Sequence, residues 1–177
     1  MTGSVTASTM ASVRICRADY RNPVHAQALL FVLDAYASER IGGGEPLSEF
    51  TRINLVGSLA ARPQAFSVLA FGRIAGDHQE HPLGLVNCIE GFSTFACRPL
   101  VNVHDVAVLL AHRGQGVAEK MLALVDEIAR ERGACKLTLE VLQGNAVAMR
   151  LYHRIGFAAY QLDPSMGQAQ CLQKWLS

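Results

Sequence analysis

The stretch HRGQGVAEKMLALVDEIARERG, from His112 to Gly133, decides how this chain is expected to fold around a ligand. Its first half places an arginine and two glycines directly before an amphipathic helix whose apolar stripe includes Val117, Met121 and Val125. The segment before it, VNVHDVAVLL, has the apolar character of a buried strand. A strand that leads through a glycine turn into a helix binds anionic phosphate well, because free backbone N–H groups point outward at the helix start. The stretch therefore predicts a site for a phosphate compound.

Three phosphate-binding patterns can be compared with the central letters RGQGVA. A Walker loop ends in Gly-Lys-Ser/Thr, which is absent. A dinucleotide fingerprint needs a small third residue where this chain has Glu119, and that carboxylate would repel a pyrophosphate. The pattern R-x-x-G-x-G/A of coenzyme A loops is matched by Arg113, Gly116 and Ala118. The alternative is that Gly114 and Gly116 only shape a tight turn between strand and helix.

The length and composition are those of a single globular domain. The chain has 177 residues, of which 50% are hydrophobic and 18% are charged. Its formal net charge of +1 gives no electrostatic reason to expect binding to nucleic acid or to an anionic membrane. No apolar run approaches the roughly 18 residues of a membrane span. We expect residues 1–12 to form a disordered tail and residues 13–177 to form the domain.

The cysteines and the start of the chain point to the cytoplasm. The first twelve residues, MTGSVTASTMAS, lack the basic and apolar regions of a signal peptide. The five cysteines are scattered and form no CxxC pair, which is typical of reduced thiols. They are Cys16, Cys88, Cys97, Cys135 and Cys171.

Hydrophobic patterns predict the element order β-α-α-β-β-β-α-β-α-β-β. The expected strands cover residues 13–20, 65–71, 83–92, 99–110, 135–142, 157–164 and 169–177. The expected helices cover residues 22–40, 48–63, 117–133 and 145–156. This order predicts an α/β (α+β) protein, with a mixed sheet and helices on both of its faces.

A second motif follows the fifth expected strand. The segment LEVLQGNAVAMRLYHRIGF carries Asn145, then Tyr152 seven residues later, then Gly156 and Phe157. Together with the glycine loop, and at this separation, it resembles the GCN5-related N-acetyltransferase (GNAT) superfamily, in particular its bacterial small-molecule acetyltransferases. The resemblance covers about residues 103–157, and earlier residues only by element order. Ala118 departs from the glycine that is more frequent there, although alanine still fits the pattern.

The resemblance implies a fold and a co-substrate. The GNAT fold is a single domain with a mixed, mostly antiparallel sheet of about seven strands. Strands four and five splay apart, and acetyl-CoA lies in the gap. The co-substrate residues it implies are Val106, Ala107, Val108, Arg113, Gly114, Gln115, Gly116, Val117, Ala118 and Asn145. Asn145 has a second interpretation as an ordinary helix N-cap.

The resemblance also implies a general acid. It gives Tyr152 the role of protonating the departing CoA thiolate. A phenol with a pKa near ~10 suits a thiolate leaving group near ~8.5 and stays protonated at neutral pH. The alternative is a core tyrosine, because Ala148, Leu151, Tyr152 and Ile155 form one apolar helical stripe.

The fourth expected strand carries the candidates for the acceptor side. Strict alternation would place Asn102 and His104 on one face, with Val106 and Val108, and Asp105 on the other. His104 matches a position that some relatives use for a base, and its imidazole pKa near ~6.5 suits that role. An equally good interpretation is a buried histidine bonded to a backbone carbonyl. Asp105 is a candidate for binding a cationic substrate.

Three functions remain open. The first is direct transfer of an acetyl group from acetyl-CoA to a small-molecule amine, with no cysteine intermediate. The second is acetylation of a peptide or protein amine, and the third is a non-catalytic acyl-CoA sensor. Acidic residues that could favour a cationic acceptor, or simply form a solvated helix face, are Asp34, Glu39, Glu45 and Glu49. Glu140 on the fifth expected strand is a further candidate beside His104 and Asp105, and alternation does not decide which face of that strand lines the cleft.

The remaining expectations concern metals and partners. His78 and His81 lie in a polar loop without a third ligand at suitable spacing, so no metal site is expected. His112 and His153 flank the motifs and are expected to face solvent. A homodimer is expected by analogy with the superfamily.

Overall fold

The chain forms two compact units, Met1–Leu139 and Glu140–Ser177. The computed structural model describes residues 10–74 and 79–160, and residues 163, 165, 167 and 170–176. Most of the expected tail, residues 1–9, lies outside the described residues, and the first strand already begins at Met10.

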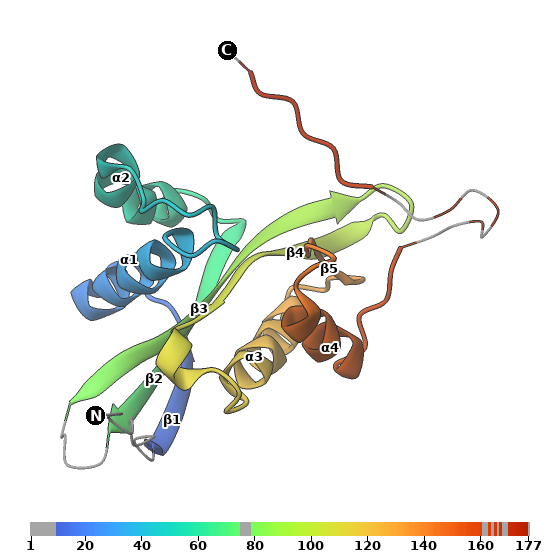
Figure 1. The fold of residues 1–177 in the computed structure, drawn as a ribbon. Helices are drawn as coiled ribbons and strands as arrows, with labels where there is room; N and C mark the ends of the chain where they lie inside the picture. The colour runs from blue at the N-terminus through green and yellow to red at the C-terminus, as the bar shows by residue number, and fades with distance from the viewer. Residues whose placement is uncertain are drawn as a thin grey trace. The chain divides into compact units, whose positions relative to one another are not determined.

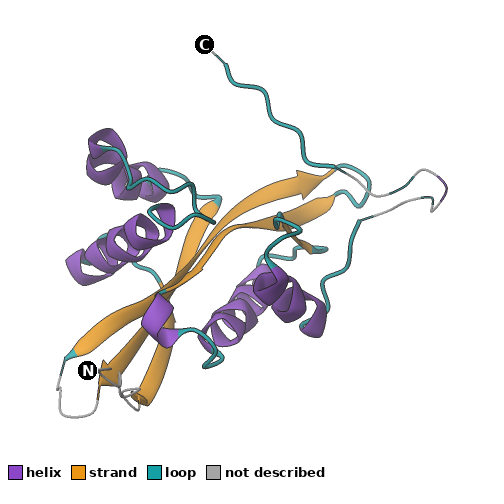
Figure 2. Cartoon of the chain, in the orientation of Figure 1, coloured by secondary structure: helices purple, strands orange, loops and turns teal. Residues whose placement is uncertain are grey.

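The first unit is built on one open sheet with the strand order β1-β2-β3-β4-β5 (Figure 1, Figure 2). The strands are β1 Met10–Arg17, β2 Ala65–Ile74, β3 Glu80–Ser93, β4 Arg98–Val108 and β5 Leu137–Leu139. All neighbours are antiparallel except β4 and β5, which run parallel. The predicted class, a mixed and mostly antiparallel sheet with helices, is confirmed.

The predicted number of strands is wrong. The described residues hold five strands, not about seven. The expected strands at 157–164 and 169–177 have no strand structure at any described position, and β5 covers three residues instead of 135–142. Leu172 and Trp175 remain 87% and 86% exposed. Alternating letters produce a strand only where a neighbour covers the apolar face and pairs with the backbone.

Two helices cover one face of the sheet. Helix α1, Pro23–Ala37, begins where Asn22 Oδ1 accepts a hydrogen bond from the Val24 amide at 2.9 Å. Helix α2, Glu49–Ala60, is capped by the Ser48 hydroxyl, which accepts from the Thr51 amide. The buried side chains of α1 and the sheet form one cluster, made of Ala28, Leu29, Val32, Leu33, Leu69, Phe71, Leu85 and Ala107. We refer to this side of the sheet as the α1 face.

Helix α3, Val117–Glu131, covers the opposite face (Figure 1). Its buried stripe includes Val117, Met121 and Val125, as the 3.6-residue period predicts. The helix lies very close to β3 at Gly84. A Cβ at that glycine would lie 2.8 Å from Met121 Cε and 2.9 Å from the Ala107 carbonyl oxygen. Only glycine fits this contact between helix and sheet.

The last strand pairing of the sheet is short. Strand β5 pairs with β4 only from Val101 to Val103, opposite Leu137 to Leu139. Strand β4 continues to Val108, and no described strand pairs with this outer edge beyond Val103. The separation of strands four and five that the family resemblance implied thus begins after Val103.

The second unit contains helix α4, Ala146–Arg154.

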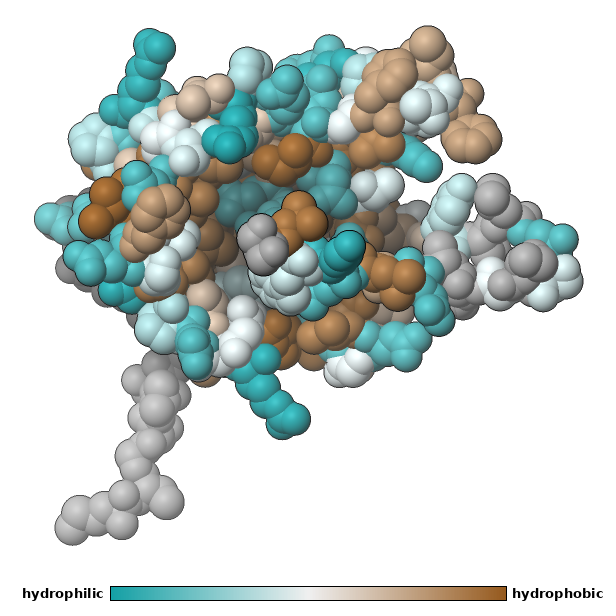
Figure 3. Space-filling view, turned by 90° about the horizontal axis from the view of Figure 1, so that it is seen from above, coloured by the Kyte–Doolittle hydropathy of each residue, from teal (hydrophilic) through white to brown (hydrophobic). Residues whose placement is uncertain are grey.

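None of the described helices combines the length and apolar character that a membrane span requires. Apolar and polar side chains are interspersed on the surface seen in Figure 3. Helix α2 contributes exposed apolar residues, because Phe50 and Ile53 remain largely in solvent.

The segment between α1 and α2 is held by Asp34. Its Oδ1 atom accepts hydrogen bonds from the Leu47 amide at 2.8 Å and from Arg52 Nη2 at 2.9 Å. The hydrogen bond from Arg52 lowers the pKa of Asp34, and the bond from Leu47 lowers it further. The carboxylate therefore links the end of α1 to the start of α2 most strongly when it is charged.

This linkage predicts a pH-dependent loss of stability in Asp34→Asn. The pKa of Asp34 in the folded protein lies below its ordinary value of 3.8. The charged carboxylate therefore adds to the folding stability above about pH 4, and this contribution disappears as the pH falls through the folded pKa and the carboxylate is protonated. We expect the variant to be destabilised by less than ~1 kcal/mol at pH 7, because both partners are partly exposed. The difference in Tm from the parent should shrink below pH 4. Glu45→Gln, an equal charge change at an exposed site, is the control, and an Asp34→Asn difference that does not vary with pH would contradict the assignment.

Candidate functional site

The glycine loop before α3 has the geometry of an anion site. Gly114 and Gly116 have φ values of +73° and +76°, in the left-handed region that glycine adopts most easily. Gly116 is the N-cap of α3 and offers no capping side chain; the first helical bond runs from the Lys120 amide to the Gly116 carbonyl. The amides of Val117 and Ala118 belong to the first turn of α3, where no carbonyl of the helix itself can accept from them. These amides and the positive end of the helix dipole are available to a phosphate group.

Arg113 fixes this loop to the rest of the first unit. Its Nε atom donates to the Val108 carbonyl at 2.8 Å, and its Nη2 atom lies 2.5 Å from Glu39 Oε1. The guanidinium therefore joins the end of β4 to the segment after α1. Gln115, also named as a co-substrate residue, donates from Nε2 to the Ala111 carbonyl at 3.3 Å. Both side chains stabilise the loop in this structure, which leaves its backbone amides as the part available to an anion.

The three strand residues named for the co-substrate lie where β4 pairs with β3 on one side only. Val106 is opposite Val86, Ala107 is opposite Leu85 and Val108 is opposite Gly84. Their outer edge lies beyond the last residue that β5 reaches. An extended ligand can add to such an edge as a strand would.

A β-bulge at His104 changes the faces of β4. Asn87 is opposite Asp105 and its neighbour Cys88 is opposite Val103, so His104 is the extra residue. Ile89, two residues from Asn87 on β3, is opposite Asn102. Asn102 and Asp105 therefore lie on the same face, and the prediction from strict alternation that they lie on opposite faces is wrong.

The side chain of Asp105 lies on the α1 face. Burial raises the pKa of Tyr36 on α1, and the negative charges of Asp105 and Glu39 raise it further, while Arg113 opposes them. These interactions place Asp105 and Glu39 within electrostatic reach of one phenol at the end of α1. His104 is exposed, which excludes the interpretation as a buried histidine. Sequence reasoning missed Tyr36, which stands among the apolar residues of α1.

A chain of polar side chains leads to Asp105 across the sheet. Asn87 Nδ2 donates to Asp105 Oδ2 at 2.9 Å, and Ser67 Oγ donates to Asn87 Oδ1 at 2.6 Å. The Tyr20 hydroxyl lies 2.8 Å from Ser67 Oγ. Sequence reasoning missed all three of these residues, and the only available signal was two polar letters, Ser67 and Asn87, inside apolar strands.

The second unit carries the remaining predicted site residues. Asn145 is the N-cap of α4, and its Oδ1 atom accepts from the Ala148 amide at 3.1 Å. This confirms the capping interpretation and leaves the amide nitrogen for a ligand. The ring of Tyr152 is buried and packs edge-on against Phe157, with ring centroids 5.8 Å apart. Glu140 follows the end of β5 instead of lying within it.

The thiols and histidines suggest no alternative chemistry. Burial raises the pKa of the Cys88 thiol to about 12, so that thiol is not a nucleophile at neutral pH. Within the described ranges, no three His, Cys, Asp or Glu side chains gather to hold a metal ion. His78 lies outside the described residues. His153 Nδ1 is 3.1 Å from the Phe157 carbonyl, and His112 ends a short 3₁₀ helix before the loop.

Two of the four acidic residues named in the region from α1 to β2 have structural partners. Asp34 binds Arg52 and Glu39 binds Arg113. Asp105 combines a position on the α1 face with an orientation that the hydrogen bond from Asn87 fixes.

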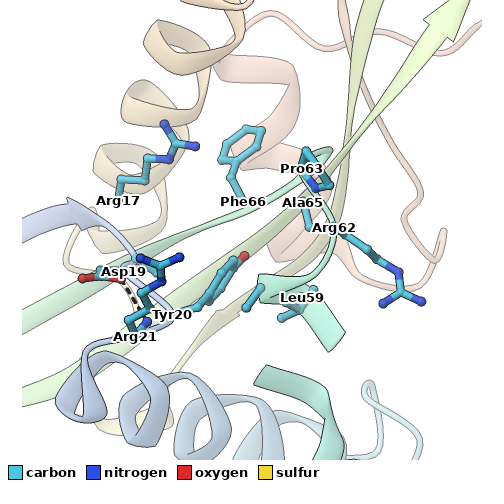
Figure 4. A pocket seen from close by; sticks show the side chains of 11 residues that line it. Arg17, Asp19, Tyr20, Arg21, Leu59, Arg62, Pro63, Ala65 and Phe66 are labelled. Atoms are coloured by element: carbon cyan, nitrogen blue, oxygen red, sulfur yellow. Dashed lines mark hydrogen bonds between the residues drawn. The ribbon is translucent and has the colours of Figure 1, made fainter. Parts of the chain in front are cut away.

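A separate hollow of about 380 Å³ lies between the segment after β1, the end of α2 and the start of β2 (Figure 4). Arg17, Arg21 and Arg62 line it together with Asp19, and the ring of Tyr20 lies within it. This net positive lining does not favour a cationic ligand.

Comparison with known proteins shows which family the sequence matches. Residues 29–157 match the family model described as Acetyltransferase (GNAT) family. The chain is 40% identical over 68 residues to streptothricin acetyltransferase of Streptomyces lavendulae, which is 38% of this chain and 36% of that protein. It is 35% identical over 86 residues to thialysine N-epsilon-acetyltransferase of Mus musculus, which is 49% of this chain and 45% of that protein. The chain thus spans less than half the length of either relative.

Solved structures with a similar fold cover nearly the whole chain. One is described as a probable acetyltransferase, with a TM-score of 0.74 and 23% identity, covering 93% of this chain and 99% of that one. Another is an aminoglycoside N-acetyltransferase in complex with CoA, with a TM-score of 0.67 and 14% identity, covering 92% of this chain and 95% of that one. At these identities the likeness concerns the fold.

Proposed function

Because this chain belongs to the acetyltransferase (GNAT) family, we propose that it transfers the acetyl group of acetyl-CoA directly to a primary amine of a small molecule. The observation that carries the proposal is the loop at Gly114 and Gly116, whose left-handed backbone leaves the amides at the start of α3 open. The loop follows directly on the part of β4 that lacks a second strand partner. A pyrophosphate suits the loop, and an extended pantetheine arm suits the strand edge.

The proposed co-substrate residues follow this division. The loop backbone from Arg113 to Ala118 would hold the pyrophosphate, with Arg113 and Gln115 acting mainly by fixing the loop. The backbone from Val106 to Val108 would bind the pantetheine arm. We propose that the Nδ2 atom of Asn145 donates a further hydrogen bond to the pantetheine arm, since the Oδ1 atom already caps α4.

The proposed chemistry needs an acid and a base. The acceptor ammonium gives up one proton before attack, and the nitrogen then bonds to the thioester carbon. As the carbon–sulfur bond breaks to release a thiolate, the nitrogen loses a second proton to water, and a proton from water later restores the phenol that protonates the thiolate. Tyr152 is proposed to donate its phenolic proton to that thiolate. His104, which is exposed in the bulge, is proposed to take the amine proton directly or through water.

Asp105 is proposed to bind the acceptor while it is still cationic. Its carboxylate lies on the α1 face, where Glu39 and Tyr36 also lie within electrostatic reach. Direct transfer agrees with the high pKa of Cys88, which removes the most buried thiol as a nucleophile. We further propose that the protein is a cytoplasmic homodimer that works without a metal ion and without nucleic acid.

The direct test is a panel of acceptors. The similar proteins are named for streptothricin, thialysine and methionine sulfoximine, which supply the small amines. Two peptides, one with a free N-terminus and one with an internal lysine, complete the panel. We expect CoA release from acetyl-CoA with at least one small amine, together with the acetylated product by mass spectrometry. Activity with the peptides alone would favour a protein acetyltransferase, and CoA binding without turnover would favour a sensor.

The loop assignment predicts that Gly116→Asp weakens CoA binding at least about tenfold, because its carboxylate would face the pyrophosphate. Gly133→Asp is the matched control, since Gly133 has nearly the same φ of +72° and equally open surroundings, but lies at the other end of α3. Aspartate tolerates this backbone region better than most residues, so both variants should fold, with the larger loss of stability in Gly133→Asp, whose carboxylate lies at the negative end of the helix dipole. Calorimetric titration with CoA measures the effect, and equal affinities in the two variants would show that the loop is only a turn.

The role of Tyr152 predicts the kinetics of Tyr152→Phe. Phenylalanine keeps the ring packing on Phe157, so Tm should change little compared with the loss of activity. A general acid contributes typically ~10²–10⁴-fold, and kcat should fall by about that factor while the KM for acetyl-CoA moves much less. A tyrosine that serves only the core would show the reverse, with a lower Tm and near-normal kcat.

A further inference from the structure

Four side chains from four successive segments form one hydrogen-bonded chain across the α1 face. Tyr20 follows β1, Ser67 lies on β2, Asn87 on β3 and Asp105 on β4. The register places Ser67 directly opposite Asn87, and Asn87 directly opposite Asp105. The chain therefore follows one rung of the sheet and ends at the carboxylate proposed to bind the acceptor.

The hydrogen bonds of this chain all point toward Asp105. An ionised carboxylate only accepts hydrogen bonds, so the amide nitrogen of Asn87 must face it, as the 2.9 Å contact shows. The amide oxygen then accepts the single proton of the Ser67 hydroxyl, at 2.6 Å. With that proton used, the 2.8 Å contact between Tyr20 and Ser67 requires the phenol to donate. Each group thus fixes the orientation of the next.

The chain is costly for a sheet of this kind. Ser67 is 0% exposed and Asn87 is 5% exposed, whereas the next rung on the same face pairs Leu69 with Leu85. Buried hydroxyl and amide groups contribute little net stability and are expensive when a partner is lost. Among the described residues of the protein, no buried polar side-chain atom lacks a hydrogen-bond partner. Every buried polar atom of the Tyr20–Ser67–Asn87–Asp105 series is therefore satisfied. Its one partly exposed carboxylate is Asp105.

We propose that Asn87, oriented by Ser67 and Tyr20, is a positioning residue that holds the Asp105 carboxylate for the ammonium group of the acceptor. The bond to Oδ2 fixes the rotation of the carboxylate and presents Oδ1 to the ligand. The ligand class is a primary ammonium cation, in agreement with the negative charge of Asp105 near Tyr36, since Glu39 is already paired with Arg113. The inference rests on the proposed function, because it assigns the residues that prepare its acceptor site.

The test uses the full chain and the best amine of the panel of streptothricin, thialysine and methionine sulfoximine. Asn87→Ala should raise the KM for that amine about ten- to hundredfold, the range of a hydrogen bond to a charged group. Ser67→Ala should raise it by less, and Tyr20→Phe by less again, in the order of distance along the chain. The KM for acetyl-CoA and the affinity for CoA should stay within about twofold of the parent in all three, because the loop before α3 is unchanged.

Ser93→Ala is the matched control for Ser67→Ala. Ser93 is also a buried serine, and its hydroxyl accepts from the Ala96 amide, outside the chain that leads to Asp105. It should lower Tm by an amount comparable to Ser67→Ala without changing the KM for the amine. Equal KM values in the two serine variants would overturn the proposal, since a merely structural role lowers Tm alone.

A double-mutant cycle supplies the second measurement. In an Asp105→Ala background, Asn87→Ala should have almost no further effect on kcat/KM for the amine, because the group it positions is gone. Independent, multiplying effects would overturn the proposal. If Asn87→Ala does not fold, the same cycle is run with Ser67→Ala or Tyr20→Phe, with the same two outcomes. If the parent protein acetylates no amine, the proposed function itself is wrong. If the parent is active and the variants have an unchanged KM for the amine, only this inference is wrong.

Discussion

The three-residue pairing between β4 and β5 sets the limits of the site. From Val101 to Val103, β4 has a hydrogen-bonded strand on each side, and beyond Val103 β3 is its only strand partner among the described residues. A backbone edge of this kind carries unpaired N–H and C=O groups, which need water or a ligand. The glycine loop and α3 follow directly after this edge, so its position also determines where the open amides at the start of α3 lie. The proposed co-substrate site depends on where one strand pairing stops.

The sequence predicted the loop but not the faces of the strand before it. Gly114 and Gly116 are local signals, because a left-handed backbone restricts the residue type at its own position. The bulge at His104 arises from the register between β3 and β4, which no single segment encodes. The extra residue moves each β4 side chain before His104 to the face opposite the one that alternation predicts. For that reason the prediction failed for Asn102 and Asp105.

The chain from Tyr20 to Asp105 was invisible in the sequence for a similar reason. Its members lie far apart in the chain, and each looks ordinary in its own segment. The opposite error occurred at the carboxyl end, where Leu172 and Trp175 suggested strands that the described residues do not form. Alternation shows that a segment has one apolar face. Whether another strand pairs with that segment depends on the whole fold. The roles of Asn145 and Tyr152 came from the family resemblance, because capping and packing explain both residues equally well.

The contact at Gly84 has a consequence for comparisons among related proteins. The absent side chain lets α3 lie against β3, with Met121 filling the space that a Cβ would take. A relative with a larger residue at the equivalent position must carry this helix farther from its sheet, or turn the methionine aside. The start of the helix, and the amides it presents, would move with it. The residue at position 84, in the middle of a strand, thus sets how closely the start of α3 can approach the sheet.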